Sequence, residues 1–219
     1  MNKTVALVLM FGLLPLWGAR GQDEPVAPAV ETTAQELPAA APQVPENPPQ
    51  EPGVEPLVYE NTQAGIRLAA PASWLAYKGI RRHPEILVMF TRFPYESRDA
   101  DNPKIVLVRE PAGKNKPDSV LALAFRHAEV VRLMRNLKDK VANTILLEEP
   151  SQEPGKVYAR LAYEITSIRK DKTQDLSRSR EYIFRGADAF YVLLCGARPE
   201  FFERHRADFD AAADKFTVK

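Results

Sequence analysis

The sequence predicts an α+β domain in which an antiparallel sheet is covered by helices. Short apolar runs bounded by turn residues indicate strands, and two longer segments repeat apolar residues at helical spacing. Cys195 is the only cysteine, so the chain has no internal disulfide and an apolar core must hold the fold together. About 160 residues are enough to build such a core.

The first half of the domain is typical of strands. Residues 86–91 and 104–109 are apolar on both faces, which indicates central strands, and a polar, turn-rich stretch separates them. Shorter strand-like runs precede them at residues 58–59, 65–68 and 75–80.

A helix is expected over residues 120–137. Asp118 can cap it and Ser119 starts it. Lys138 and Lys140 follow in the last turn, where positive charge complements the helix dipole. The apolar stripe of this helix consists of Val120, Leu123, Ala124, Val131 and Met134.

The second half returns to strands and ends in a helix. Residues 157–168 alternate between apolar and polar side chains, as a half-buried antiparallel strand does, and a charged loop follows at residues 169–179. Residues 181–184 are expected to return as the hairpin partner. Further strands are expected at residues 144–147 and 190–195. Pro199 starts the last helix, whose apolar positions are Phe202, His205, Phe209, Ala213 and Phe216.

The N-terminus has the features of a secretory signal peptide over residues 1–21. A short basic start leads into an apolar run at residues 5–17, and Ala19 and Gly21 occupy the small-residue positions of a cut before Gln22. The sequence therefore predicts an exported protein, periplasmic or secreted, with no transmembrane segment after cleavage. The alternative is an uncleaved N-terminal anchor.

Residues 22–56 form an acidic, proline-rich arm that is expected to be disordered. The arm holds nine prolines and seven acidic residues, and it has no Lys, Arg, Phe, Trp, Tyr or Ile. It can serve as a tether reaching about 100 Å if fully extended, or alternatively as a PxxP ligand. The domain at residues 57–219 carries 28 Lys plus Arg against 22 Asp plus Glu. Such asymmetry favours an acidic partner, an anionic surface or the arm itself.

The order of elements and several local patterns resemble the PsbP-like family over residues 57–219. The resemblance implies an α/β/α sandwich with an antiparallel sheet between helices. It also implies docking on protein partners in place of catalysis. It rests on Tyr59-Glu60-Asn61 followed by Gly65-Ile66-Arg67-Leu68, Pro71 and Trp74, on the helix at residues 119–137, and on Tyr191-Val192-Leu193-Leu194 followed by Glu200-Phe201-Phe202 and Phe216.

No motif predicts a catalytic residue, a metal ligand or a cofactor. The sequence has no GxSxG, CxxC or HExxH pattern. His127 and His205 lie on the apolar stripes of the two helices, where they could line a pocket between helix and sheet. That alternative describes a small-ligand-binding protein or a hydrolase. In the other interpretation both histidines are core residues with satisfied ring nitrogens.

Basic residues predict where a partner binds. Arg169, Lys170, Lys172, Arg178 and Arg180 flank the charged loop, although Asp171 and Asp175 can neutralise part of this cluster. A second basic group closes the first helix: Arg132, Arg135, Lys138 and Lys140. No aromatic residue lies between these bases and the overall charge is nearly balanced, which disfavours nucleic acid. The sequence therefore predicts a non-enzymatic binding or accessory module for a protein or an anionic envelope component.

Overall fold

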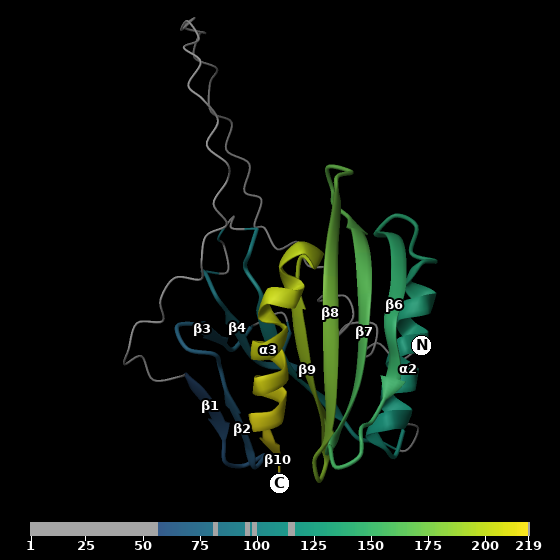
Figure 1. Cartoon of the computed structure of the whole chain (residues 1–219). Coiled ribbons are helices and arrows are strands. Elements are labelled where there is room, and N and C mark those ends of the chain that lie inside the picture. Colours follow the sequence, from purple (N-terminus) through teal and green to yellow (C-terminus); the bar gives the residue numbers. More distant parts are fainter. Residues whose placement is uncertain (1–56, 81–82, 95–96, 98–99, 114–116, 219) are drawn as a thin grey trace, which may run out of the picture.

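The computed structural model describes residues 57–80, 83–94, 97, 100–113 and 117–218 (Figure 1). These residues form two helices and ten strands in two antiparallel sheets, which confirms the predicted α+β class. The predicted signal peptide (1–21) and arm (22–56) lie outside the described residues. Within the described part of the chain, neither helix combines the length and apolar character needed to cross a bilayer.

The main sheet has seven strands in the order β3-β4-β5-β9-β8-β7-β6. The central position of β5 and β9 explains why both strands are apolar on both faces, as predicted. In chain order the strands are β3 (Leu75–Lys78), β4 (Ile86–Thr91), β5 (Lys104–Pro111), β6 (Val141–Ser151), β7 (Tyr158–Ile168), β8 (Gln174–Arg185) and β9 (Ala189–Ala197).

A smaller sheet joins the two ends of the domain. It consists of β1 (Val58–Asn61), β2 (Ile66–Ala69) and β10 (Thr217–Val218), in the order β1-β2-β10. Thr217 pairs with Arg67, so the C-terminal strand closes on a hairpin from the start of the domain. The sequence patterns did not predict this second sheet.

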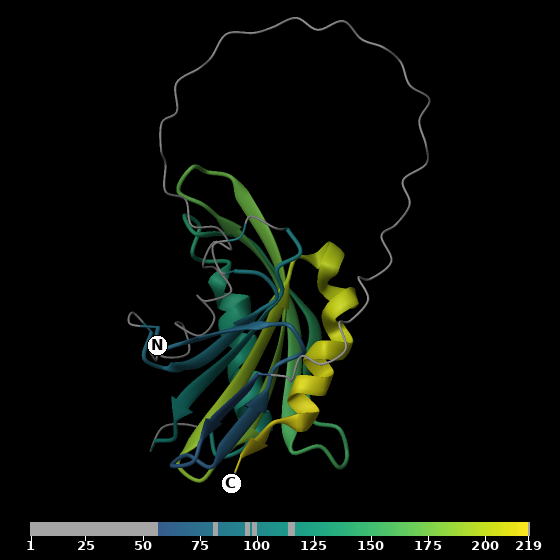
Figure 2. The same ribbon diagram turned by 90° about the vertical axis from the view of Figure 1, so that its left-hand side faces the viewer.

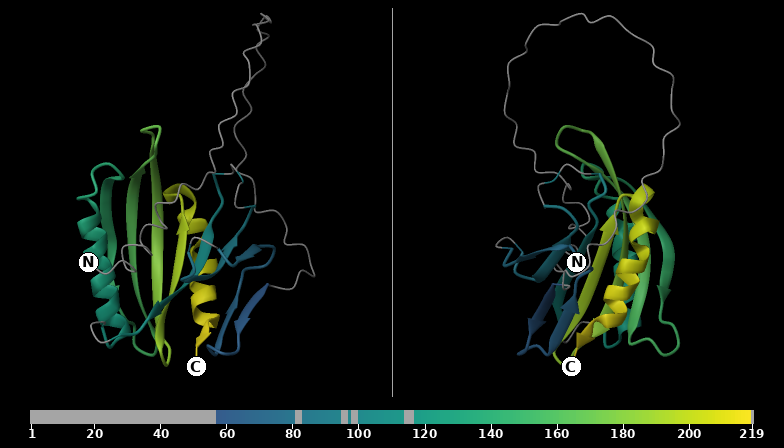
Figure 3. Two further views of the ribbon diagram at one scale, coloured as in Figure 1. Left: turned by 180° about the vertical axis from the view of Figure 1, so that it is seen from behind. Right: turned by 60° about the vertical axis from the view of Figure 1, so that its left-hand side comes forward.

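The helices lie on opposite faces of the main sheet (Figures 2 and 3). Helix α2 (Val120–Met134) begins at Ser119, whose backbone is extended and whose side chain accepts a hydrogen bond from the Ala122 amide at 3.2 Å. The cap is thus one residue later than the predicted Asp118. Helix α3 (Pro199–Lys215) begins at the predicted proline.

Each helix closes its own apolar core against the sheet. The α2 core includes Leu123 and Val131 from the helix and Val108 and Val192 from the strands beneath it. The α3 core lies on the other face and also takes in the small sheet, through residues such as Leu68. The result is the layered arrangement of helix, sheet and helix that the resemblance implied.

Strand β6 forms one edge of the main sheet and is irregular. Its pairing with β7 shifts register three times, and Pro150 lies within the last irregular stretch. Despite these register shifts, neighbouring side chains of β6 still point to opposite faces of the sheet. Glu148 bonds to Arg180 of β8, whereas Glu149 bonds to Arg132 of α2.

Candidate functional site

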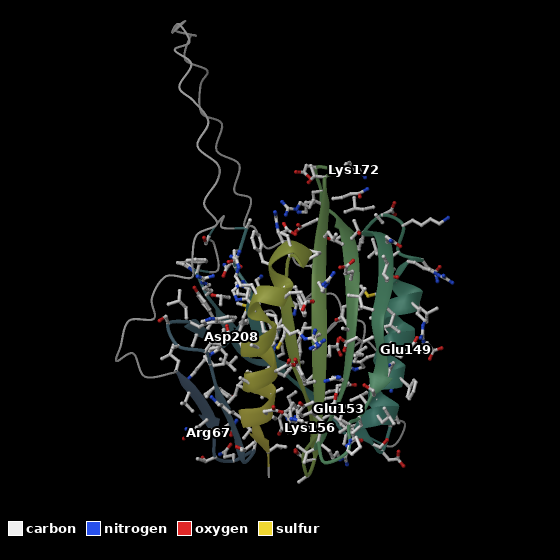
Figure 4. All side chains as sticks on the ribbon, in the orientation of Figure 1. Arg67, Glu149, Glu153, Lys156, Lys172 and Asp208 are labelled. Atoms are coloured by element: carbon white, nitrogen blue, oxygen red, sulfur yellow. The ribbon has the colours of Figure 1, made fainter. Side chains whose placement is uncertain are left out.

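Two basic segments that are distant in sequence meet at one end of the sheet. The backbone amide of Ile168, at the end of β7, donates to the carbonyl of Lys140 in the turn between α2 and β6, at 2.8 Å. That turn therefore lies beside the β7–β8 hairpin, whose tip projects at the top of Figure 4, where Lys172 is labelled. Exposed lysines come from both segments, and we call them the lysine end: Lys138, Lys140, Lys170 and Lys172.

The hairpin tip is held by hydrogen bonds of its own. The Arg169 amide donates to Thr173 O at 2.9 Å, and the Lys172 amide donates to Arg169 O at 3.0 Å. Asp171 accepts from the Thr173 hydroxyl at 2.6 Å and from the Thr173 amide at 3.0 Å. These bonds from Thr173 lower the pKa of Asp171. The carboxylate is thus engaged with the turn itself, and no ion pair joins it to Lys170 or Lys172 among the described residues.

Lys172 occupies a backbone conformation that favours glycine. Its φ is +67°, in the left-handed region, where a Cβ atom is crowded by the following carbonyl. Replacing Lys172 with glycine is therefore expected to raise the free energy of unfolding by up to about 1 kcal/mol. Urea titration measures this change. Lys170→Gly is the matched control, because Lys170 has an ordinary backbone, and it should destabilise the chain instead. A loss of stability in both variants would contradict the prediction.

The three arginines of the predicted partner-binding cluster are engaged within the fold. Arg169 bonds to Asp175 at 2.8 Å, and the Asp175 side chain is 9% exposed. Arg178 bonds to Glu164 on β7 at 2.9 Å and to Glu203 on α3 at 3.1 Å. The structure thus separates the five predicted residues into paired arginines and the exposed Lys170 and Lys172.

Arg180 is the most deeply placed of the cluster. Its side chain is 2% exposed and contacts Glu148 on β6 and Asp210 on α3, the latter at 3.3 Å. Burial by itself lowers the pKa of Arg180, but Tyr182 and the two carboxylates outweigh it and raise the pKa. The guanidinium links helix, central sheet and edge strand, so the residue lies inside the structure and not on an exposed loop.

The sequence contained a signal for this division that loop-based reasoning did not use. Strand β8 begins at Gln174, earlier than the predicted return at residue 181. Arg178 and Arg180 are two apart on that strand, so they share the face on which β7 presents Glu164. Period-two alternation extended back to Gln174 would have predicted a cross-strand ion pair for Arg178, which lies opposite Glu164. Arg180 lies opposite Ala162, so its partners on β6 and α3 depend on tertiary structure.

The lysine end carries net positive charge, because its four lysines outnumber the two exposed carboxylates between them. In the ranges that the structure describes, none of its four lysines forms an ion pair, although most exposed arginines do. Asp139 and Asp171 are the exposed carboxylates nearest in sequence, and Asp171 is bonded to the turn. Clustered charge of one sign attracts an oppositely charged partner from a distance of about one Debye length, ~10 Å at moderate salt.

His127 lies at the centre of a buried polar chain. Its Nδ1 is 2.6 Å from Glu181 Oε2 and its Nε2 is 3.3 Å from Glu110 Oε2. Tyr163 donates its hydroxyl to the other oxygen of Glu181 at 2.8 Å. The side chains of His127, Glu110 and Glu181 are all 0% exposed.

The charge state of this chain follows from its neighbours. Burial by itself lowers the pKa of His127, but Glu181 and Glu110 outweigh it and raise the pKa to about 9. A protonated His127 donates to both carboxylates, so the cluster is an internal ion pair between α2 and the strands β5 and β8. General acid–base catalysis requires contact with a substrate, and these side chains have no exposed atoms through which to make it.

His205 occupies a polar junction on the other face of the sheet. Its Nε2 is 2.5 Å from Asp101 Oδ1, and the second oxygen of Asp101 accepts from Arg92 and from Arg204, each at 2.9 Å. The ring is 5% exposed and meets Trp74 edge-on with centroids 6.4 Å apart. This junction fastens α3 to the segment between β4 and β5.

A cleft of about 600 Å³ lies at the end of the sheet opposite the hairpin tip. The β1–β2 turn and the β8–β9 turn form its walls, and neither His127 nor His205 lines it. Its lining consists of residues 61–65, Leu87, Arg109, Ala187 and Asp188. Arg109 and Asp188 bond to each other at 2.5 Å across it, which neutralises its main charges.

The remaining candidates for site chemistry are few. No group of three or more His, Cys, Asp or Glu side chains among the described residues is arranged to hold a metal ion. Cys195 is buried, and burial raises the pKa of its thiol. A thiol without ready access to its thiolate form is a poor nucleophile.

The comparisons with known proteins support the fold. The solution structure of cyanobacterial PsbP (CyanoP) from Synechocystis sp. PCC 6803 is similar with a TM-score of 0.51 at 15% identity, covering 76% of this chain and 94% of that one. The fold is therefore PsbP-like, as the sequence patterns predicted. No protein-family model and no curated protein matches the chain.

Two other solved structures are similar at a lower level. LpqN of Mycobacterium tuberculosis, described as involved in cell envelope biogenesis, has a TM-score of 0.45 at 14% identity, covering 75% of this chain and 91% of its own. PA94 from Pseudomonas aeruginosa has a TM-score of 0.39 at 14% identity, covering 75% of this chain and 97% of its own.

Proposed function

We propose that this chain is an exported, non-enzymatic binding or accessory module whose lysine end docks on an anionic protein or envelope component. One observation carries the proposal: four exposed lysines from two distant segments gather at one end, and no described carboxylate pairs with them. The features typical of a signal peptide at residues 1–21 support export.

The contrast between this end and the rest of the domain supports docking over mere solvation. Arg178, Arg180 and Arg132 each bond to carboxylates of neighbouring elements, so the fold has many partners for its cations. Gathering unpaired like charges costs electrostatic free energy that dispersed lysines would avoid. An anionic partner removes this cost when it binds.

The test replaces the lysine end with neutral side chains. The chain from Gln22 onward is titrated with a fluorescein-labelled poly-glutamate peptide, and the dissociation constant is measured by anisotropy. Neutralising all four lysines to glutamine is expected to weaken binding about tenfold at low salt, because each exposed charge contributes ~0.2–1 kcal/mol. For the parent, binding should weaken further as salt shortens the reach of the charges.

A matched control separates the lysine end from overall charge. Four basic residues on other surfaces are replaced by glutamine, giving the same change in net charge. They are Lys78, Arg126, Arg185 and Lys215. The control is expected to bind the peptide within about twofold of the parent. Equal losses in the two variants would mean that net charge, and not the lysine end, attracts the peptide.

A further inference from the structure

We infer that the acidic arm, residues 22–56, occupies the lysine end of its own chain and competes there with external anionic partners. This inference rests on the proposed function, because it concerns regulation of the same surface. The arm carries seven carboxylates and no basic residue, whereas the lysine end carries four lysines without described ion pairs. The two segments are therefore complementary in charge.

The connection between arm and domain favours contact over free diffusion. The arm joins the domain at Leu57, immediately before β1, and it contains 35 residues. The 35-residue arm can extend about 100 Å, whereas a folded domain of the size of residues 57–219 has a radius of gyration of about 15 Å. Every face of the domain is thus within reach.

Tethering gives the arm an advantage over any separate anion. A segment linked to its target has an effective concentration on the order of mM, so weak charge contacts suffice to populate the bound state. The residues between the carboxylates are mostly prolines and alanines, so apolar contacts should contribute little to binding and charge should contribute most. The contact should therefore be weak, electrostatic and displaced by a denser polyanion.

The surface it covers carries four exposed lysine side chains, with Asp139 and Asp171 between them. Lys170 and Lys172 stand on the hairpin tip, and Lys138 and Lys140 stand on the turn bonded to β7. The neighbouring Arg169 is engaged with Asp175, so its charge is already partly satisfied. The arm thus neutralises the part of the domain that lacks internal partners.

The experiment measures the labelled poly-glutamate peptide against four versions of the chain from Gln22 onward. One is the parent, and one has the arm neutralised by Asp23→Asn and by glutamine at its six glutamates. The other two carry the lysine-end replacements, with and without the neutralised arm. Arm neutralisation is expected to tighten peptide binding about fivefold when the lysines are present, and to have no effect when they are glutamine.

Two controls remove the effect of net charge. In the variant with Lys78, Arg126, Arg185 and Lys215 replaced by glutamine, neutralising the arm should still tighten binding about fivefold. A shuffled arm that keeps all seven carboxylates should behave as the parent does, and high salt should abolish the difference.

The possible outcomes separate the two proposals. If the parent and the arm-neutralised chain bind the peptide equally, the arm does not occupy the lysine end, while the docking proposal stands as long as the lysine replacements weaken binding. If the gain persists without the four lysines, it is a net-charge effect and the inference fails. If the lysine replacements have no effect in either background, the docking proposal itself fails.

Discussion

Replacing His127 with alanine is expected to lower the free energy of unfolding by about 3–5 kcal/mol, the largest effect of any single substitution considered for this chain. The imidazolium contacts both Glu110 and Glu181, and all three side chains are 0% exposed. Its removal takes away the cation that joins two buried carboxylates, and it also opens a cavity beneath α2. Urea titration followed by circular dichroism measures the change.

A triple variant tests the reason for this loss. Replacing His127, Glu110 and Glu181 together with leucine, methionine and methionine removes every charge of the cluster while filling its volume. This chain is expected to be more stable than His127→Ala, because replacing a whole buried ion pair by apolar groups costs less than breaking it. A triple variant that is less stable than the single one would show that volume and the loss of the acceptor for Tyr163, and not uncompensated charge, dominate.

The proton on His127 is expected to persist well into the alkaline range. Burial opposes the charge, but Glu181 and Glu110 outweigh burial and raise the pKa to about 9, from 6.5 for an ordinary histidine. The folded state therefore binds this proton more tightly than the unfolded state does. The resulting stability is fully present below pH 6.5 and is lost as the pH rises through about 9. Its loss between pH 7 and pH 10 amounts to roughly 2–3 kcal/mol.

Lys104 has the opposite pH dependence and must be removed from the measurement. Burial lowers its pKa to about 8, while Asp175 partly opposes this, so its contribution to stability increases with pH between about 8 and 10.5. The stability of Lys104→Met is therefore compared at pH 7 and pH 10 with that of the double variant Lys104→Met/His127→Gln. Between pH 7 and pH 10, the free energy of unfolding of Lys104→Met should fall by roughly 2–3 kcal/mol, whereas that of the double variant should not.

Nuclear magnetic resonance provides a direct check of the same prediction. At pH 8 the imidazole signals of His127 should still be those of the protonated ring. A histidine in the unfolded chain is mostly neutral at this pH. A midpoint near 6.5 for the His127 signals would contradict the assignment of the ion pair.

The layered fold could be predicted because local patterns report on burial. Strands that are apolar on both faces, such as residues 86–91 and 190–195, lie between other strands and not at the edges of the sheet. The apolar stripe of residues 120–137 faces the core in α2, and Pro199 marks the start of α3. The spacing of apolar residues and the positions of proline and turn residues are sufficient to predict these features, because each feature depends on residues close together in the chain.

The buried ion pair could not be predicted in the same way. His127 was identified as a residue on an apolar stripe, but its partners depend on strand order: Glu110 lies on β5 and Glu181 on β8, with β9 between them. Local spacing does not indicate which strands become neighbours. The two basic segments illustrate the same point, since each was visible in the sequence while their meeting depends on the pairing of β6 with β7.

The small sheet was missed for a related reason. Thr217 and Val218 are too few to show any alternation, and they become a strand only because α3 delivers them to Arg67 and Ile66. Tertiary context decides the state of such short segments.

The irregular pairing of β6 also bears on how this protein behaves when many copies are crowded together. Edge strands with regular, unbroken hydrogen-bonding groups recruit extended segments from other molecules and seed fibrils. An incoming segment would meet donors and acceptors that fall out of step three times along β6, and at Pro150 it would meet no amide hydrogen at all. The β6 border of the sheet is thus a poor template for adding a strand from a second molecule.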